Sequence, residues 1–292
     1  MHTYPLLTPL EQGNLPALIA VPSLLPSKFA DSTHQVFLCE TVDGPMVLKV
    51  CDEGSVTQSG FWQGLNHLFL ADFPNSLEQI DRTHDLLAKQ GCFAIPEYVA
   101  SSRGRFVLSR FITGEDVTSA QVTDEMVLQL ARHVGQLHQQ SQSTWGNLHA
   151  PVYEARDWPK RLHATLLALA AQSGVTIRKS FLQDVLTQAN AIEESEFTPM
   201  MLDLRWDQFR TLEQSNQLAL IDLDAFVIGP RALELVLLEY VLTPQHFALF
   251  KATYTQMNNW PDYSAQKASY QLLLFLMQVL GEVDLASWMK RI

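Results

Sequence analysis

The alternation of apolar and polar positions divides the chain into a β-like first part and a helical second part. Between residues 34 and 50, the segments HQVFLCETV and PMVLKV flank Asp43-Gly44, a pair typical of a tight hairpin turn. A second hairpin is predicted around residues 102–105, ahead of FVLSRFITGEDV. Residues 1–30 are rich in proline and leucine, so we expect an irregular arm there rather than a long helix.

Helical periodicity marks residues 75–90 and becomes dominant after residue 123. The 75–90 segment begins with an N-cap signal and ends at Gly91. Thr123 and Asp124 can cap the next helix, in which His138 is expected to pack or to form a hydrogen bond near the end. The segment TWGNLHAP that follows is typical of a loop. Two helices separated by a Ser-Gly pair are predicted in residues 156–194, and more in residues 231–242, 244–257 and 263–292.

Two aspartates are brought to one place by a predicted hairpin. Asp203 lies in a short loop after an apolar run, and the segments FRTLEQ and QLALID, separated by Ser215-Asn216, lead to Asp222. Phosphoryl transfer needs such a pair, because one carboxylate orients the attacking hydroxyl while another holds the Mg²⁺ that neutralises the phosphates.

The same stretch resembles the catalytic core of the aminoglycoside phosphotransferase and choline kinase group. The motifs of that group are H-G-D-x-x-x-x-N and a later I-D followed by G-x-x-x-x-D-L-A. Here the first reads Met201-Leu202-Asp203 through Gln208, and the second reads Ile221-Asp222 followed by GPRALEL. The resemblance implies an α+β, protein-kinase-like fold of two lobes. Residues 1–114 would form a small antiparallel β-sheet N-lobe that binds nucleotide, and residues 115–292 a larger, mostly helical C-lobe with the catalytic loop and the acceptor side.

The resemblance also implies roles for individual residues. Asp203 would orient or deprotonate the acceptor hydroxyl, and Lys49, on the strand VLKV, would contact the phosphates of ATP. Asp222 and Gln208 would hold Mg²⁺. Because the extra methylene of glutamine moves its amide oxygen outward by about 1.5 Å relative to asparagine, a neighbouring acid, Asp207 or Asp224, would compensate.

The remaining nucleotide contacts are expected from three segments. The helix over residues 75–90 would offer a carboxylate to the strand lysine, either Glu78 or, preferably, Asp81, although both are equally consistent with ordinary surface residues. Ser109 and Phe111 would line the adenine pocket through backbone groups. The loop PSKFADSTHQ contains no glycine, so neither a P-loop nor a dinucleotide-binding motif is present, and Ser32 and Thr33 are the expected phosphate-side donors.

Composition narrows the classes of function. The 292-residue chain is 47% hydrophobic and 17% charged, which suits one large domain or two lobes sharing a cleft. A formal net charge of −11 argues against sequence-independent nucleic-acid binding. It is compatible with a cationic small substrate, and equally with an acidic surface that keeps a protein in solution. Three cysteines without a CxxC spacing indicate neither a disulfide framework nor a zinc site.

The chain shows no targeting or membrane signal, so a cytoplasmic protein without membrane contact is expected. The leading hypothesis is an ATP- and Mg²⁺-dependent phosphotransferase acting on a hydroxyl of a small molecule. A second hypothesis is a catalytically impaired kinase-fold protein that serves as a nucleotide-binding or scaffolding module. It is motivated by the glycine-free loop and by Met201, Leu202 and Gln208, which replace the His, Gly and Asn of the family motif.

Overall fold

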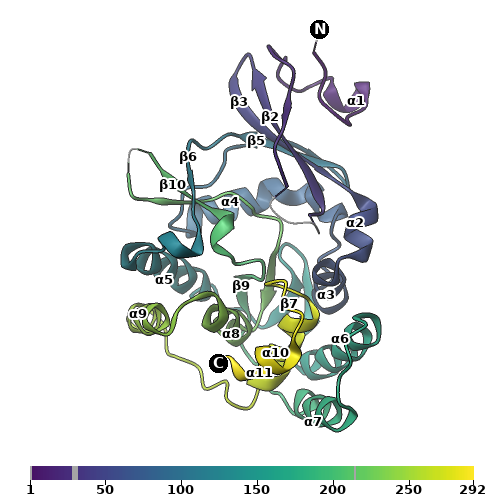
Figure 1. Cartoon of the computed structure of the whole chain (residues 1–292), viewed down its shortest axis with the longest axis vertical. Helices are drawn as coiled ribbons and strands as arrows, with labels where there is room; N and C mark the ends of the chain where they lie inside the picture. Colours follow the sequence, from purple (N-terminus) through teal and green to yellow (C-terminus); the bar gives the residue numbers. More distant parts are fainter. Residues whose placement is uncertain (1, 28–31, 214) are drawn as a thin grey trace.

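A computed structural model describes residues 2–27, 32–213 and 215–292. The N-terminal part is built on a five-stranded antiparallel sheet, drawn at the top of Figure 1, in the order β1-β2-β3-β5-β4. Its strands are β1 (Ser23–Leu24), β2 (His34–Thr41), β3 (Gly44–Cys51), β4 (Tyr98–Ser102) and β5 (Phe106–Arg110).

Both predicted hairpins of the N-lobe are confirmed. In the first, Thr41 pairs with Gly44, so the turn residues are Val42 and Asp43, one position before the predicted pair Asp43-Gly44, and Gly44 begins β3. Gly44 has φ +102°, which favours glycine because it lacks a Cβ atom. One face of the sheet carries a small core that includes Leu48 and is covered by side chains of the N-terminal arm, where Pro9–Gln12 form the short helix α1.

Three further helices of the first part lead from this sheet towards the C-lobe: α2 (Glu53–Gln58), α3 (Gly60–Phe69) and α4 (Ile80–Gln90). The buried face of α3 belongs to the large core shared with the C-lobe. The segment 75–90 starts with the 3₁₀ turn η1 (Asn75–Gln79). Neither η1 nor α4 has a side-chain hydrogen bond at its N-cap, so the predicted N-cap is wrong. The predicted end of the helix at Gly91 is confirmed.

The C-lobe is mostly helical, as expected. Thr123 caps α5 (Asp124–His138) by accepting a hydrogen bond from the Met126 backbone. In Figure 1, α5 and α9 lie on one side of the lobe and α6 and α7 on the other. The remaining helices are α6 (Trp158–Gln172), α7 (Lys179–Asn190), α8 (Arg231–Val241), α9 (Pro244–Tyr254), α10 (Lys267–Leu276) and α11 (Leu285–Lys290), with single 3₁₀ turns η2 (Ser119–Gln121), η3 (Ala155–Asp157) and η4 (Trp206–Gln208).

Two small antiparallel sheets hold the middle of the molecule. The predicted hairpin after Asp203 is confirmed, because β10 (Phe209–Leu212) pairs with β11 (Leu218–Leu220) and, on its other side, with β6 (Gly114–Asp116); Gln214 of this hairpin lies outside the described residues. The second sheet has the order β8-β7-β12-β9 and consists of β7 (Thr144–Asn147), β8 (Pro151–Glu154), β9 (Thr198–Met201) and β12 (Phe226–Gly229).

The second sheet corrects one prediction. The segment TWGNLHAP does not form a simple loop, because it contributes β7 and the start of β8. Trp145 is fully buried in the large core, and β7 pairs with β12, so burial and pairing order a segment whose sequence is typical of a turn.

The proposed boundary near Gly114 coincides with a close contact between two segments. A Cβ atom at Gly114 would lie 2.3 Å from the Thr211 carbonyl oxygen of β10, so only glycine fits there. The division into lobes of residues 1–114 and 115–292 stays a prediction, since α3 packs in the core of the C-lobe.

Candidate active site

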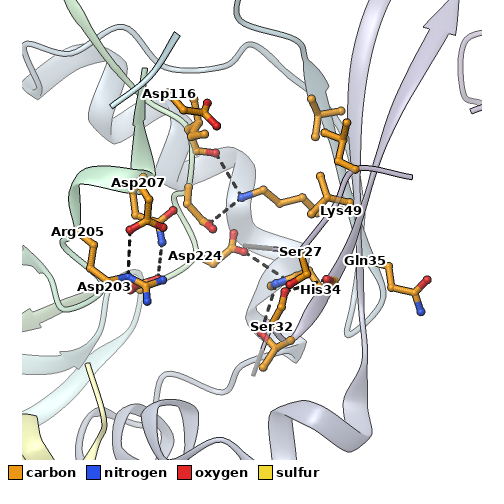
Figure 2. A pocket seen from close by; sticks show the side chains of 18 of the residues that line it. Ser27, Ser32, His34, Gln35, Lys49, Asp116, Asp203, Arg205, Asp207 and Asp224 are labelled. Carbon is orange, nitrogen blue, oxygen red and sulfur yellow. Dashed lines mark hydrogen bonds and ion pairs between the residues drawn. The ribbon is translucent and has the colours of Figure 1, made fainter. Parts of the chain in front are cut away.

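A cavity of about 570 Å³ lies between the N-lobe sheet and the β10–β11 hairpin. The side chains of Lys49, Asp203, Gln208 and Asp222, all singled out from the sequence, line it together. Figure 2 shows Lys49 reaching from the sheet towards the acids of the opposite wall. Residues from both predicted lobes therefore share one site.

Lys49 and Asp222 form the central ion pair of the cavity. The Lys49 ammonium is 2.8 Å from Asp222 Oδ1 and donates to the Ile221 carbonyl oxygen at 3.3 Å. Burial on its own lowers the pKa of Lys49, but Asp222 outweighs it, and the pKa lies above the ordinary value. Burial raises the pKa of Asp222, yet the Lys49 ammonium more than compensates and holds that pKa below its ordinary range. Both groups are therefore charged at neutral pH.

Asp203 is held by two side chains of its own loop. Gln208 Nε2 donates to Asp203 Oδ2 at 2.7 Å, and Arg205 Nε lies 3.0 Å from Asp203 Oδ1. Arg205 also lies 3.6 Å from Asp207, as the dashed lines in Figure 2 show. Burial raises the pKa of Asp203 to about 8, against the opposing effect of Arg205. A carboxyl group whose pKa lies near neutral pH is suited to accept a proton from a substrate.

Asp224 faces His34 across the cavity, a contact that the sequence did not indicate. Asp224 Oδ2 lies 3.5 Å from His34 Nε2 (Figure 2), and burial raises the pKa of Asp224 to about 7. Burial also lowers the pKa of His34 to about 4, so the imidazole is neutral.

Polar groups lie near both ring nitrogens of His34. Trp62 Nε1 donates to Thr33 Oγ1 at 3.1 Å, and Thr33 Oγ1 lies 3.4 Å from His34 Nδ1. His34 Nε2 is buried without a hydrogen-bond partner among the described residues and lies 3.5 Å from Asp224 Oδ2. Ser32 and Thr33 both line the cavity, whereas residues 28–31 of the same loop lie outside the described part.

A buried glutamate holds the backbone just before Asp203. Glu234, near the start of α8, accepts a hydrogen bond from the Met201 backbone at 2.8 Å and lies 2.7 Å from His138 Nε2. His138 also contacts the Tyr254 hydroxyl at 2.9 Å, which confirms the hydrogen bonding expected of His138. The role of Glu234 was missed, although a lone acid in the apolar segment RALELVLL is a signal of a buried, paired carboxylate.

Backbone hydrogen bonds tie the two acid-bearing segments together. The Ile221 N–H donates to the Gln208 carbonyl oxygen at 2.9 Å, directly before Asp222. This bond places the loop of Asp203 beside the end of β11, so the spacing of the two acids is set by backbone geometry as well as by side chains.

Ser109 and Phe111 line the cavity at the end of β5, where the two parts of the chain meet. Arg210 of β10 stabilises this junction: its guanidinium lies over the Phe111 ring at 4.8 Å, donates to the Ile112 carbonyl oxygen at 2.8 Å and pairs with Asp116 at 2.7 Å. The segment expected to receive the adenine is thereby linked to the β10–β11 hairpin.

The structure does not bring the helix acids to Lys49. Asp81 is exposed on α4 and does not line the cavity, and Glu78 lies 3.8 Å from Arg103. The buried side of α4 instead presents His84, whose Nδ1 contacts the Pro96 carbonyl oxygen at 2.8 Å. Asp222, not an acid of α4, is the ion-pair partner of Lys49 in this conformation.

The donor set fits a hard cation such as Mg²⁺. Among the described residues, no three His, Cys, Asp or Glu side chains are arranged to hold a metal by themselves. Mg²⁺ in kinases is bound through one or two carboxylates together with waters and phosphates, so Asp222 and Asp224 suffice on the protein side. Asp224 Oδ2 is buried and has no hydrogen-bond partner within the described ranges, so a cation would satisfy this oxygen. The Gln208 amide nitrogen is used by Asp203, which leaves the amide oxygen for a cation.

Comparison with known proteins identifies a family and a fold. The model of the phosphotransferase enzyme family matches residues 28–268, while no curated protein matches the chain. The macrolide 2′-phosphotransferase MphH from Brachybacterium faecium is 13% identical, with 96% of each chain covered and a TM-score of 0.59.

Two aminoglycoside enzymes have the same fold. The APH(2″)-IIa structure with gentamicin is 15% identical, with 88% of this chain and 81% of that chain covered and a TM-score of 0.57. An APH(2″) structure with GDP and kanamycin is 16% identical, with 92% of this chain and 87% of that chain covered and a TM-score of 0.57.

The described part of the chain contains no helix long and apolar enough to cross a membrane, and the cytoplasmic location stays a prediction.

Proposed function

The chain belongs to the phosphotransferase enzyme family, and we propose that it transfers the γ-phosphate of ATP to a hydroxyl group of a small molecule. The observation that carries this proposal is the convergence of Lys49, Asp203 and Asp222 on one cavity, with the Lys49 ammonium 2.8 Å from Asp222. These groups match, residue by residue, the parts that kinases use to hold and transfer a phosphoryl group.

The N-lobe side of the cavity holds the nucleotide. The backbone at Ser109 and Phe111 receives the adenine, and Lys49, which pairs with Asp222 in this structure, contacts the phosphates, while Asp222 would hold the metal. His34 lines the cavity, and with its proton on Nε2 it donates to a phosphate oxygen and thereby supplies a donor that the glycine-free loop lacks.

The C-lobe side carries out the chemistry. Asp222, with Gln208 or Asp224, would hold Mg²⁺, which would neutralise charge on the β- and γ-phosphates. Asp203 takes the proton of the acceptor hydroxyl as its oxygen bonds to the γ-phosphorus, and the bond from that phosphorus to the bridging oxygen breaks, releasing ADP. Gln208 and Arg205 keep the Asp203 carboxyl oriented during this step.

The departures from the family motif do not favour the non-catalytic alternative. Glu234 contacts the catalytic-loop backbone at the Met201 N–H, a contact that does not depend on the side chain at 201, and Gln208 still contacts Asp203. A protein that had lost phosphotransferase activity would not need a lysine and two acids around one cavity.

The test is phosphate transfer from ATP labelled at the γ-phosphate to a panel of hydroxyl compounds. We expect at least one compound to become labelled, and the Asp203→Asn variant to be about 10²–10⁴-fold slower. Asp85→Asn, at an exposed position of α4, is the matched control and should be unchanged. Equal rates for wild type and Asp203→Asn would refute the catalytic assignment.

A further inference from the structure

Arg205 lies in the catalytic loop two residues after Asp203, and its side chain lines the cavity that Lys49 and Asp222 share. Its backbone is extended, with φ −134° and ψ 154°, directly before the turn η4. The Gln208 N–H closes this turn by donating to the Arg205 carbonyl oxygen at 3.1 Å. The turn that brings Gln208 to Asp203 therefore also fixes the backbone from which the Arg205 side chain extends.

The Arg205 guanidinium lies beside two carboxylates of its own loop. Its Nε is 3.0 Å from Asp203 Oδ1 and 3.6 Å from Asp207 Oδ1 (Figure 2), and only 23% of the Arg205 side chain is exposed. A guanidinium is not deprotonated in proteins, and its planar fork fits a phosphate through two parallel N–H bonds. Arg205 thus places a permanent positive charge within hydrogen-bond distance of the proposed catalytic base.

The position of Asp203 determines how near the γ-phosphate comes to Arg205. The acceptor hydroxyl that gives its proton to Asp203 lies within about 2.6–3.2 Å of that carboxylate. In the transfer step the oxygen of this hydroxyl bonds to the γ-phosphorus, so the phosphoryl oxygens lie directly beside it. Because Arg205 Nε contacts the same carboxylate at 3.0 Å, the guanidinium and the phosphoryl group are both next to Asp203.

The charges that line the cavity favour a second cation at this end. Five aspartates line it: Asp116, Asp203, Asp207, Asp222 and Asp224. A bound triphosphate adds further negative charge. Of the cations in the described lining, Arg210 pairs with Asp116 at 2.7 Å, and the side chain of Arg110 is 41% exposed at the end of β5. Within this described lining, Lys49 and Arg205 are the cations that lie among the other four acids.

We propose that Arg205 contacts the γ-phosphate of the bound nucleotide and neutralises charge on the phosphoryl group as it moves to the acceptor, besides orienting Asp203. The inference rests on the proposed function, because it adds a residue to that reaction. Charge is spread over the equatorial oxygens of the phosphoryl group during transfer, and a cation already fixed in a partly buried site stabilises it more than a solvated cation does. Since Asp203 and Asp207 hold the guanidinium before the nucleotide arrives, little side-chain entropy is lost on binding.

The test compares two nucleotides that differ by the γ-phosphate, ADP and AMPPNP, a non-hydrolysable analogue of ATP. In calorimetry with Mg²⁺ and the full chain, Arg205→Gln should weaken AMPPNP binding about tenfold and change ADP binding less than about twofold. Arg205→Lys keeps the charge without the planar fork and should lose less affinity for AMPPNP. Arg103→Gln, at a side chain that is 65% exposed and does not line the cavity, is the control and should bind both nucleotides as the wild type does.

A second background separates a contact with the phosphate from an effect of the neighbouring acids. In Arg205→Gln, the carboxylates of Asp203 and Asp207 lose a positive neighbour and repel the γ-phosphate, which also lowers the affinity for AMPPNP. The comparison is therefore repeated in a protein that carries both Asp203→Asn and Asp207→Asn. A direct contact predicts that Arg205→Gln still weakens AMPPNP binding about tenfold in this background and still leaves ADP binding unchanged.

A loss of AMPPNP affinity that appears only while the two carboxylates are present would overturn the inference. Equal losses for ADP and AMPPNP, or no loss for either nucleotide, in both Arg205 variants would overturn it as well. These results would leave the proposed function standing when the wild type binds AMPPNP with Mg²⁺. If the wild type bound neither nucleotide, the proposed function itself would fail, and the inference with it.

Discussion

Replacing His34 tests how a loop without glycine contacts phosphates. His34→Ala removes the proposed phosphate donor, Nε2, which lies 3.5 Å from Asp224 Oδ2. A hydrogen bond to a charged group contributes about 1.5–3 kcal/mol, and the lower end of this range corresponds to about a tenfold change in affinity. We therefore expect about a tenfold higher dissociation constant for ATP.

Adenosine is the internal control for this prediction, because it has the base and the ribose but no phosphate. Calorimetry should show weaker binding of Mg²⁺-ATP to His34→Ala and unchanged binding of adenosine. His34→Gln, which restores an N–H donor at a similar reach, should recover part of the affinity. An equal loss for adenosine would mean that the substitution disturbs the cavity as a whole, for instance through the edge contact of the ring with Phe73 at 5.7 Å, and would refute the phosphate contact.

Three further substitutions probe the other parts of the site. Lys49→Ala should weaken ATP binding at least tenfold in a folded protein, whereas Lys89→Ala, at an exposed lysine of α4, should not change it. Equal ATP dissociation constants for the wild type and Lys49→Ala would show that Lys49 does not contact the nucleotide. Gln208→Asn should strengthen Mg²⁺ binding, since the shorter amide brings the ligand oxygen to the family position, and unchanged Mg²⁺ titration would show that the departure at 208 is neutral. Glu234→Ala leaves the Met201 N–H and His138 without their partner and should cost about 3 kcal/mol in urea unfolding, with Glu234→Gln losing less; similar losses for both would deny a specific role to the carboxylate.

The elements that the sequence predicted well are those whose signal is local. The helices after Thr123 have apolar residues at helical spacing. The two N-lobe hairpins have a glycine with positive φ at or directly after the turn, Gly104 with φ +66° and Gly44 with φ +102°. The hairpin between Asp203 and Asp222 is also local, which is why the two acids could be placed together before the structure was known.

The features that escaped prediction depend on partners distant in the sequence. β9 and β12 are four residues long and fully buried, so they lack the alternation that marks a half-exposed strand. Glu234 and His138 are 96 residues apart, and their contact exists only once α5 and α8 pack against β9. On α4, the family resemblance suggested Asp81, but the helix turns its buried face with His84 inward and leaves Asp81 in solvent.

The proposed function depends most directly on Asp222, the carboxylate that would hold Mg²⁺ and through it the phosphates of ATP. The decisive measurement is an ATP titration by calorimetry, with Mg²⁺ and with a chelator, on the wild type and on Asp222→Asn. We predict that the wild type binds ATP with Mg²⁺ and loses most of this affinity in the chelator, and that Asp222→Asn shows no such dependence on Mg²⁺. Binding of ATP to Asp222→Asn that remains as strong and as dependent on Mg²⁺ as in the wild type would contradict the account.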